Sequence, residues 1–240
     1  MRQKNIIAVF WLLTACFTLS AQTATTLPKL RITASGGVGH LFSEGSSEIN
    51  GIVNHERVNE MTSGLRWATH VNGDIHYLFP IGLGMGVKYL FQQTSATVDG
   101  VTIDMDDGIH YLVSDISEKN LVNFVGPSLL GYTAFGNTGR FFLSSAVSAG
   151  YAWLRSQGSI LRQNLLVTSG NFAMNADVGV DYLLHSSFGV GLNVGYMLAT
   201  FSKIKITDGT NSQEQTLNRD ARYNAGNLYL SVGIRYLLNH

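Results

Sequence analysis

Long stretches in which apolar and polar residues alternate constrain this chain more than any other feature. In residues 171–184, every second residue from Phe172 to Leu184 is apolar, and the residues between them include the carboxylates Asp177 and Asp181. Successive side chains of a strand point to opposite faces, so alternation of this length predicts a strand. Such a strand would have one apolar face and one charged face.

Seven further segments alternate in the same way. The alternation is clear in 65–79, 81–92, 188–201 and 227–238, and weaker in 29–42, 120–135 and 141–154. Because Pro127 cannot donate a hydrogen bond to a neighbouring strand, we expect a bulge there. Strands in soluble proteins usually run ~5–6 residues. A tilted membrane-spanning strand needs ~9–11, so these longer segments favour a membrane protein.

Aromatic residues on two predicted strands fit the thickness of a membrane. Trp67 and Tyr77 are ten residues apart, as are Phe172 and Tyr182. At ~3.3 Å per residue and a tilt of about 40°, ten residues cover roughly 25 Å, the height of the apolar band between the aromatic girdles of a membrane barrel.

Short and long connections between the predicted strands alternate along the chain. The short ones are residue 80, 136–139 and 185–187, and the long ones are 43–64, 93–119, 155–165 and 202–222. In lipid every backbone group must be hydrogen-bonded internally, so strands can span only as a closed barrel. We therefore predict an all-β fold, a single eight-stranded antiparallel up-and-down transmembrane β-barrel. Four long loops would be extracellular and both termini periplasmic.

The first residues have a different character. Arg2 and Lys4 precede an apolar run over 6–17, and small residues follow up to Ala21. This pattern predicts a signal peptide over 1–21 and a barrel domain over 22–240. Cys16, the only cysteine, lies in that segment, where it is either a small apolar residue or a lipid-modified cysteine of a lipobox. Without it the mature chain has no thiol for a disulfide, a metal or nucleophilic catalysis.

Charged residues form only 13% of the chain, against ~25% in soluble domains, and the formal net charge is zero. The near-neutral balance gives no electrostatic reason to expect nucleic acid as a partner. Four basic residues make the last long connection slightly cationic: Lys203, Lys205, Arg219 and Arg222.

Two segments resemble those of a known family. Residues 124–132 (FVGPSLLGY) are similar to a common segment of the outer membrane protein β-barrel domain group of Gram-negative bacteria, which includes the small OmpA/OmpX-type barrels. Residues 229–236 (YLSVGIRY) resemble the last-strand signal of such barrels, although the chain ends on His240 and not on an aromatic. The resemblance implies a place in the cell outer membrane and contact with its lipid and lipopolysaccharide. We expect the four cations of the last long connection to face the lipopolysaccharide phosphates. The resemblance also implies assembly by the barrel-assembly machinery and a possible extracellular partner at the loops.

The polar faces of the strands predict a polar network in the barrel interior, the lumen. Its expected members are Arg66, His70, Asp74, His76, Lys88, Asp177, Asp181 and Arg235, with Asn175, Asn193 and Tyr229 beside them. The interior of an eight-stranded barrel is just wide enough for side chains to fill. The network is either a plug of ion pairs or a narrow water or ion path gated by Arg235 or Lys88.

No motif predicts catalytic, cofactor-binding or metal-binding residues. Asp74 and His76 could share a metal, but a site needs three or four ligands. The acidic loop 104–108 could hold calcium, but its carboxylates lack the spacing of an EF-hand. His185 and Ser187 have the His-x-Ser spacing of lipid A deacylases but fall in a predicted periplasmic turn. The leading hypothesis is thus a non-enzymatic barrel with a structural or surface-interaction role. The alternatives are porin-like passage of small solutes or hydrophobic molecules and, more distantly, a lipid-modifying enzyme.

Overall fold

The computed structural model describes residues 27–42, 54–104, 111–160, 163–209, 211–218 and 222–238. The predicted signal peptide, with Cys16, and most of the acidic loop lie outside these ranges, as does Arg219. Eight long strands form the barrel in the described residues: β1 (Leu30–Leu41), β2 (Trp67–Leu78), β3 (Leu83–Asp104), β4 (Tyr111–Phe135), β5 (Phe141–Ile160), β6 (Gln163–His185), β7 (Phe188–Phe201) and β11 (Asn227–Leu238).

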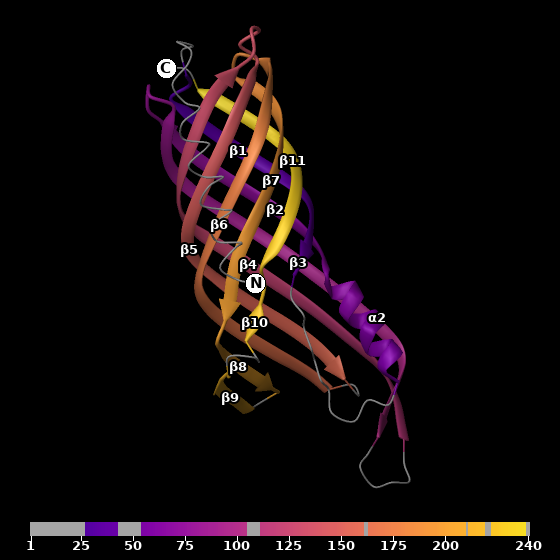
Figure 1. The fold of residues 1–240 in the computed structure, drawn as a ribbon. Helices are drawn as coiled ribbons and strands as arrows, with labels where there is room; N and C mark the ends of the chain where they lie inside the picture. Colours follow the sequence, from indigo (N-terminus) through magenta and orange to yellow (C-terminus); the bar gives the residue numbers. More distant parts are fainter. Residues whose placement is uncertain are drawn as a thin grey trace.

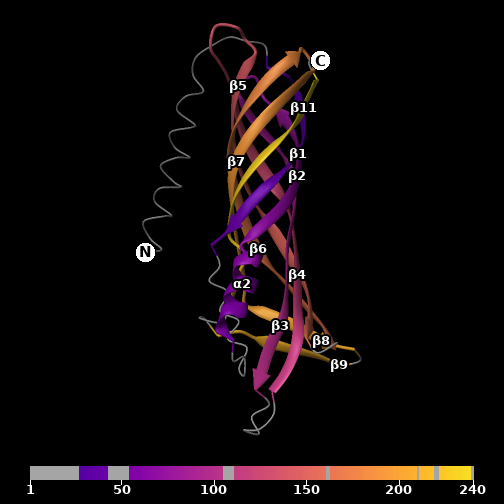
Figure 2. The same cartoon turned by 90° about the vertical axis from the view of Figure 1, so that its right-hand side faces the viewer.

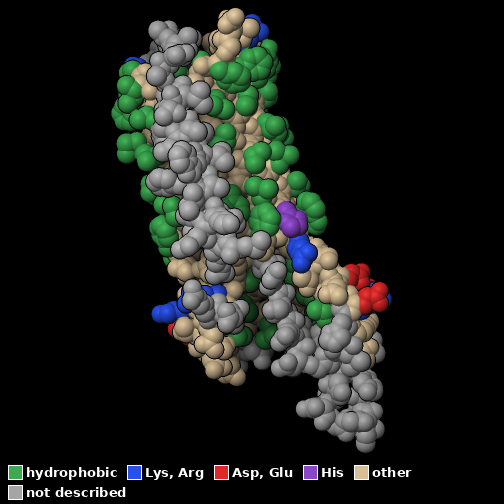
Figure 3. All heavy atoms as spheres, viewed as in Figure 1, with side chains coloured by type: hydrophobic (Ala, Val, Ile, Leu, Met, Phe, Trp, Pro, Cys, Tyr) green, Lys and Arg blue, Asp and Glu red, His purple; other side chains and the backbone are tan. Residues whose placement is uncertain are grey.

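These strands close into a barrel in which sequence neighbours pair in antiparallel fashion (Figure 1). The first and last strands also pair, with Leu30 opposite Leu238, and β6 pairs with β7. The predicted all-β, eight-stranded up-and-down barrel is therefore confirmed. The alternation is confirmed as well: along β2, Trp67, Val71 and Ile75 are more than half exposed, whereas His70 and Asp74 are buried in the lumen. Hydrophobic side chains cover much of the wall in Figure 3.

Four consecutive strands extend beyond the rest at one end of the barrel. β3 to β6 contain 22, 25, 20 and 23 residues, against 12 to 14 in β1, β2, β7 and β11. In Figure 2 these extensions lie at the lower end of the molecule, below β1, β2, β7 and β11. The pattern predicts loops for these segments, because residues such as Gln93 to Ser95 show no apolar alternation. Outside a membrane the outer face of a strand needs none.

Three short strands and a helix complete the extended end. β8 (Lys203–Asp208) and β9 (Asn211–Thr216) form a hairpin that pairs with β6, and β10 (Tyr223–Asn224) pairs with β7. Helix α2 (His55–Leu65) lies in the region predicted as a loop. Its side chains Val58 and Met61, one helical turn apart, pack against three buried residues of β3 and β4: Val98, Val101 and Ile116. Across the described residues, no helix is long and apolar enough to cross a membrane.

The bulge predicted at Pro127 is wrong. Pro127 lies opposite Val87 of β3 in an unbroken register, and the β4–β5 register is the same before Val125 and after Ser128. Gly126 and Gly150 approach each other so closely that neither has room for a Cβ atom. The missing donor of Pro127 is therefore accommodated without an extra residue, because two facing glycines keep the strands together.

Candidate functional site

Two arginines share one aspartate in the part of the lumen nearer the short turns. Asp181 of β6 accepts hydrogen bonds from Arg235 of β11 (Nε to Oδ1, 2.7 Å) and from Arg31 of β1 (Nη2 to Oδ2, 3.0 Å). Arg235 also donates to Asn193 at 2.8 Å and to Ser35 at 3.3 Å. Both Arg235 and Asp181 have no exposed side-chain surface, so each charge depends on its partners for stabilisation.

Arg31 links this pair to a second carboxylate. Its Nη1 atom lies 3.1 Å from Oδ1 of Asp74 on β2. Asp74 also accepts from Thr33 at 2.5 Å and lies 3.0 Å from Nδ1 of His76. The other ring nitrogen of His76 lies 2.9 Å from the Ser128 hydroxyl on β4. A chain of polar contacts thus crosses the barrel from β11 to β4.

A separate ion pair joins Lys88 of β3 to Asp177 of β6, with 2.5 Å between Nζ and Oδ2. Both side chains are buried. With this pair, three basic side chains oppose three carboxylates among the described lumen residues. We call this set the lumen network: Arg31, Asp74, Lys88, Asp177, Asp181 and Arg235, with their partners Thr33, His76, Ser128 and Asn193. Apart from His76 its charges balance, as burial in a protein interior requires.

Glycines on the inner face of β7 make room for the larger side chains. A Cβ atom at Gly191 would overlap with Asp181 and Arg235, and one at Gly195 would overlap with the ring of Tyr229. On β6, a Cβ at Gly179 would overlap with Asn193. The lumen is therefore packed around its polar groups, because each large side chain faces a residue that has none.

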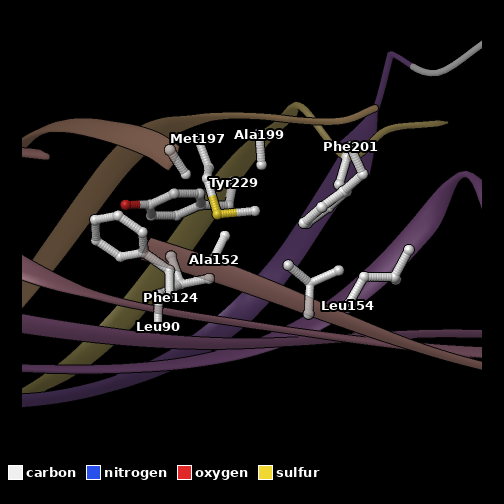
Figure 4. Packing of buried hydrophobic residues seen from close by; sticks show 11 residues of the cluster. Leu90, Phe124, Ala152, Leu154, Met197, Ala199, Phe201 and Tyr229 are labelled. Carbon is white, nitrogen blue, oxygen red and sulfur yellow. The ribbon is translucent and has the colours of Figure 1, made fainter. Parts of the chain in front are cut away.

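Apolar side chains lie on both sides of the lumen network. The cluster nearer the short turns, here the turn-side cluster, contains Leu78, Leu130, Tyr132, Phe142 and Ala146. The Tyr132 ring lies 5.3 Å below the Arg31 guanidinium and stacks on Phe142. The cluster nearer the long loops, here the loop-side cluster, contains Leu90, Val122, Phe124, Ala152, Leu154, Ala173, Met197, Ala199, Phe201, Ala225 and Tyr229. In Figure 4 the larger of these side chains point toward one another across the lumen.

The structure places seven of the eight predicted network residues in the lumen. Asp74, His76, Lys88, Asp177, Asp181 and Arg235 make the contacts described above. His70 is buried against the Tyr229 ring, 4.6 Å between centroids, and its two ring nitrogens lack a hydrogen-bond partner among the described residues. Tyr229 in turn donates to Asn175. His70 therefore belongs to the boundary between the network and the loop-side cluster.

The expectation for Arg66 is wrong. Arg66 is exposed and follows the last residue of α2, one residue before β2 begins. Its backbone N–H donates to Ser63, which ends the helix. The alternation had been extended two residues too far, because α2 was not expected.

Arg31 is the functional residue that sequence reasoning missed. It joins two aspartates, yet the alternation of β1 is loose because Gly36, Gly37 and Gly39 carry no side chain. The signal was present in the order Leu30, Arg31, Ile32, in which an arginine stands between two apolar residues.

No group of three or more histidine, cysteine or acidic residues in the described ranges could hold a metal ion. Asp74 and His76 bond to each other and to neighbouring lumen side chains. The acidic loop considered for calcium lies mainly outside the described residues.

Comparison with known proteins identifies the family. The family model for the outer membrane protein beta-barrel domain matches residues 9–236. The chain belongs to this family. The resemblance noted in the sequence is thereby confirmed, and this family member is an outer-membrane β-barrel protein. No curated protein matches the chain.

Solved structures of other outer-membrane proteins share the fold. OprG from Pseudomonas aeruginosa is 14% identical, with a TM-score of 0.51, and the match covers 89% of this chain and 97% of that one. A major outer membrane protein from Thermus thermophilus is 13% identical, with a TM-score of 0.50, over 86% and 98% of the two chains. The protease OmpT from Escherichia coli is 11% identical, with a TM-score of 0.49, over 91% and 100%. At these identities the likeness to OprG and to the Thermus thermophilus protein concerns the fold alone, and nothing about this chain is inferred from the match to OmpT.

Proposed function

We propose that this family member is a non-enzymatic barrel with a closed lumen, which anchors the extended ends of β3 to β6, with α2 and the β8–β9 hairpin, at the cell surface. In this proposal the long extensions are extracellular and the short turns and termini are periplasmic. The observation that carries it is the charge-balanced lumen network between two apolar clusters. An outer-membrane protein with a filled lumen acts through its surfaces.

The energetics of the network favour a closed state. Moving Arg235 aside would strip Asp181 of its shortest hydrogen bond, at 2.7 Å, in a site without solvent exposure. Removing one partner of a buried ion pair typically costs about 3–5 kcal/mol, so spontaneous opening of the lumen would be rare. The same argument disfavours Arg235 or Lys88 as a gate that swings between aspartates.

The test is single-channel conductance of the refolded mature chain in a planar bilayer. Folding is checked by the gel shift of the unboiled barrel, and a known porin in the same membrane verifies the recording. We expect no steady current from the folded protein. A reproducible ohmic current would overturn the closed-lumen proposal.

The non-enzymatic part of the proposal rests on the setting of the His-x-Ser motif. His185 of the motif is exposed at the turn between β6 and β7, and its Nδ1 lies 3.2 Å from Oγ of Ser186, the residue between the two motif positions. In the proposed orientation this turn is on the periplasmic side, away from the outer-leaflet lipid. We expect the refolded protein to release no fatty acid from lipid A in a mass-spectrometric assay, and release would make the barrel a lipid hydrolase.

A second candidate function, the binding or passage of hydrophobic molecules, is favoured by the loop-side cluster. Phe124, Met197 and Phe201 are fully buried inside the barrel. A lumen that served only polar solutes would not need apolar side chains at these positions. An apolar fluorophore that brightens on binding distinguishes the two functions. Fluorescence that depends on the barrel and is lost in Met197→Glu would favour a hydrophobic ligand. No binding would leave the cluster a packing element.

A further inference from the structure

A basic residue follows directly on the aromatic girdle along the outer face of β5. Tyr151 and Trp153 are exposed on the outer face of β5, and Arg155 is the next residue on that face. Phe172 of β6 lies opposite Tyr151 and is 62% exposed. Two residues beyond the girdle correspond to roughly 5 Å along the barrel axis, which is the depth of the lipid head groups.

The strand register aligns two cations, Arg155 and Lys205, and places a third, Lys119, diagonally beside Arg155. Arg155 lies directly opposite Thr168 of β6, and Thr168 lies directly opposite Lys205 of β8. Lys119 of β4 lies opposite Gln157 of β5. Because Gln157 is two residues along from Arg155, Lys119 is the diagonal neighbour of Arg155. All three cations are exposed. We call Lys119, Arg155 and Lys205 the basic row.

The surroundings of the basic row favour an anionic ligand with an apolar tail. On β3 and β4 the exposed acids Asp99 and Asp115 lie farther from the girdle than Lys119, so the cations come first after the apolar band. Glu214 lies opposite Lys205. It belongs to β9, the strand of the hairpin that is farther from β6. Figure 3 shows basic side chains gathered where the apolar band ends, in the region where Figure 1 labels β8.

The girdle next to the row also offers a hydroxyl. A Cβ atom at Gly170 would overlap with the Tyr151 hydroxyl, so this hydroxyl extends over Gly170. Gly170 lies opposite Trp153, two residue pairs along the register from Arg155 and Thr168. The patch thus combines flat aromatic surface, a hydroxyl and three cations within two neighbouring steps of the register.

We propose that the basic row binds the phosphate groups of a phosphorylated glycolipid of the outer leaflet, with its acyl chains against Tyr151, Trp153 and Phe172. Arginine presents a planar fork that matches two phosphate oxygens, and the lysines act as point charges on either side. This inference rests on the proposed orientation, which places the row in the outer leaflet. It adds Lys119 and Arg155 to Lys205, one of the four cations of the last loop that the sequence analysis expects to face such phosphates.

The test is retention of lipid A by the full barrel in native mass spectrometry. The variant is Lys119→Gln/Arg155→Gln/Lys205→Gln. The matched control, Lys29→Gln/Arg57→Gln/Arg140→Gln, removes the same charge from the opposite barrel end and from α2. Each cation near an anionic lipid surface contributes roughly a five-fold change in affinity, so we expect the row variant to lose about a hundred-fold. The control is expected to keep the wild-type affinity.

Three results would overturn the inference: unchanged retention in the row variant, an equal loss in the control, or equal retention of lipid A without phosphates. Inorganic phosphate at millimolar concentration is expected not to compete with lipid A. If it displaces the lipid, the row is a phosphate site and not a lipid site. The gel shift verifies folding of every variant. Conductance is measured independently of lipid retention. A barrel that conducts ions and still retains lipid A contradicts only the closed-lumen proposal. A barrel that does not conduct and does not retain lipid A contradicts only the basic-row proposal.

Discussion

At the scale of single residues, the stability of the barrel interior depends on keeping each buried charge paired. Arg235 meets Asp181, Asn193 and Ser35, three groups from three different strands. A surface pair such as Arg57 and Glu60 has water to replace a lost partner, whereas Asp181 does not. The same change of arginine to alanine should therefore have very different effects at the two positions.

Arg235→Ala should lower the free energy of unfolding by about 3–5 kcal/mol, because it leaves Asp181 with one arginine where it had two. The measurement is urea unfolding in lipid vesicles, followed by tryptophan fluorescence and the gel shift. Arg57→Ala is the control and should leave the urea midpoint unchanged. An unchanged midpoint for Arg235→Ala would show that the network does not stabilise the barrel.

Gly191→Ala should be destabilising by about 1–3 kcal/mol, because its methyl group overlaps with the Asp181–Arg235 pair. Gly158→Ala is the matched control, since the nearest atom to a Cβ there is 4.0 Å away. Equal unfolding midpoints for the two variants would contradict the close packing inferred for the lumen.

How far the site could be predicted also depends on single residues. Asp177, Asp181 and Arg235 stand in strands whose alternation is nearly perfect, so their inward direction could be read directly. Arg31 stands in a strand rich in glycine, where one face has few side chains to set the phase. The prediction for Arg66 is wrong for another reason: the end of a helix resembles the start of a strand when only the polarity of the residues is counted. The partner of each charge depends on register across the barrel, which no local pattern contains.

At the scale of elements, the strands were predictable where lipid imposes alternation and unpredictable beyond it. β1, β2, β7 and β11 end close to their expected limits, whereas β3 continues to Asp104, twelve residues past the predicted end. Those residues are held by hydrogen bonds to β4 and not by contact with lipid. Helix α2 was missed because its apolar contact is only two side chains wide.

Helix α2 should detach when its contact with β3 is made polar. Val58→Asp/Met61→Asp places two charges against Val98, Val101 and Ile116, and charges are not buried there without partners. We expect faster tryptic cleavage at Arg57 and Arg66 while the gel shift of the barrel is unchanged. Asn59→Asp/Ser63→Asp, on the exposed side of the helix, is the control and should retain the wild-type cleavage rate. Equal cleavage rates in both variants would mean that α2 does not depend on this contact.

At the scale of the whole molecule, the proposed orientation can be tested with single cysteines, because Cys16 is the only cysteine in the chain and lies in the predicted signal peptide. Ser212→Cys is exposed on β9, and Thr138→Cys is exposed in the turn between β4 and β5. Intact cells are treated with a maleimide too large to pass the outer membrane. We expect labelling of Ser212→Cys alone, and lysed cells serve as the control for reactivity. Labelling of Thr138→Cys alone would reverse the orientation.

The lumen network also has a consequence for the order of assembly. Arg31 binds Asp181 across 150 residues of sequence, and the strand that carries Arg31 pairs with the last strand, β11. While the chain is incomplete, Asp181 has neither Arg235 nor a closed wall around it. Its charge is therefore paired only in the final joining of β1 to β11, which makes this step the one that distinguishes a finished barrel from a partial sheet. Loss of an inward charge should then slow closure of the barrel, even where the completed fold survives.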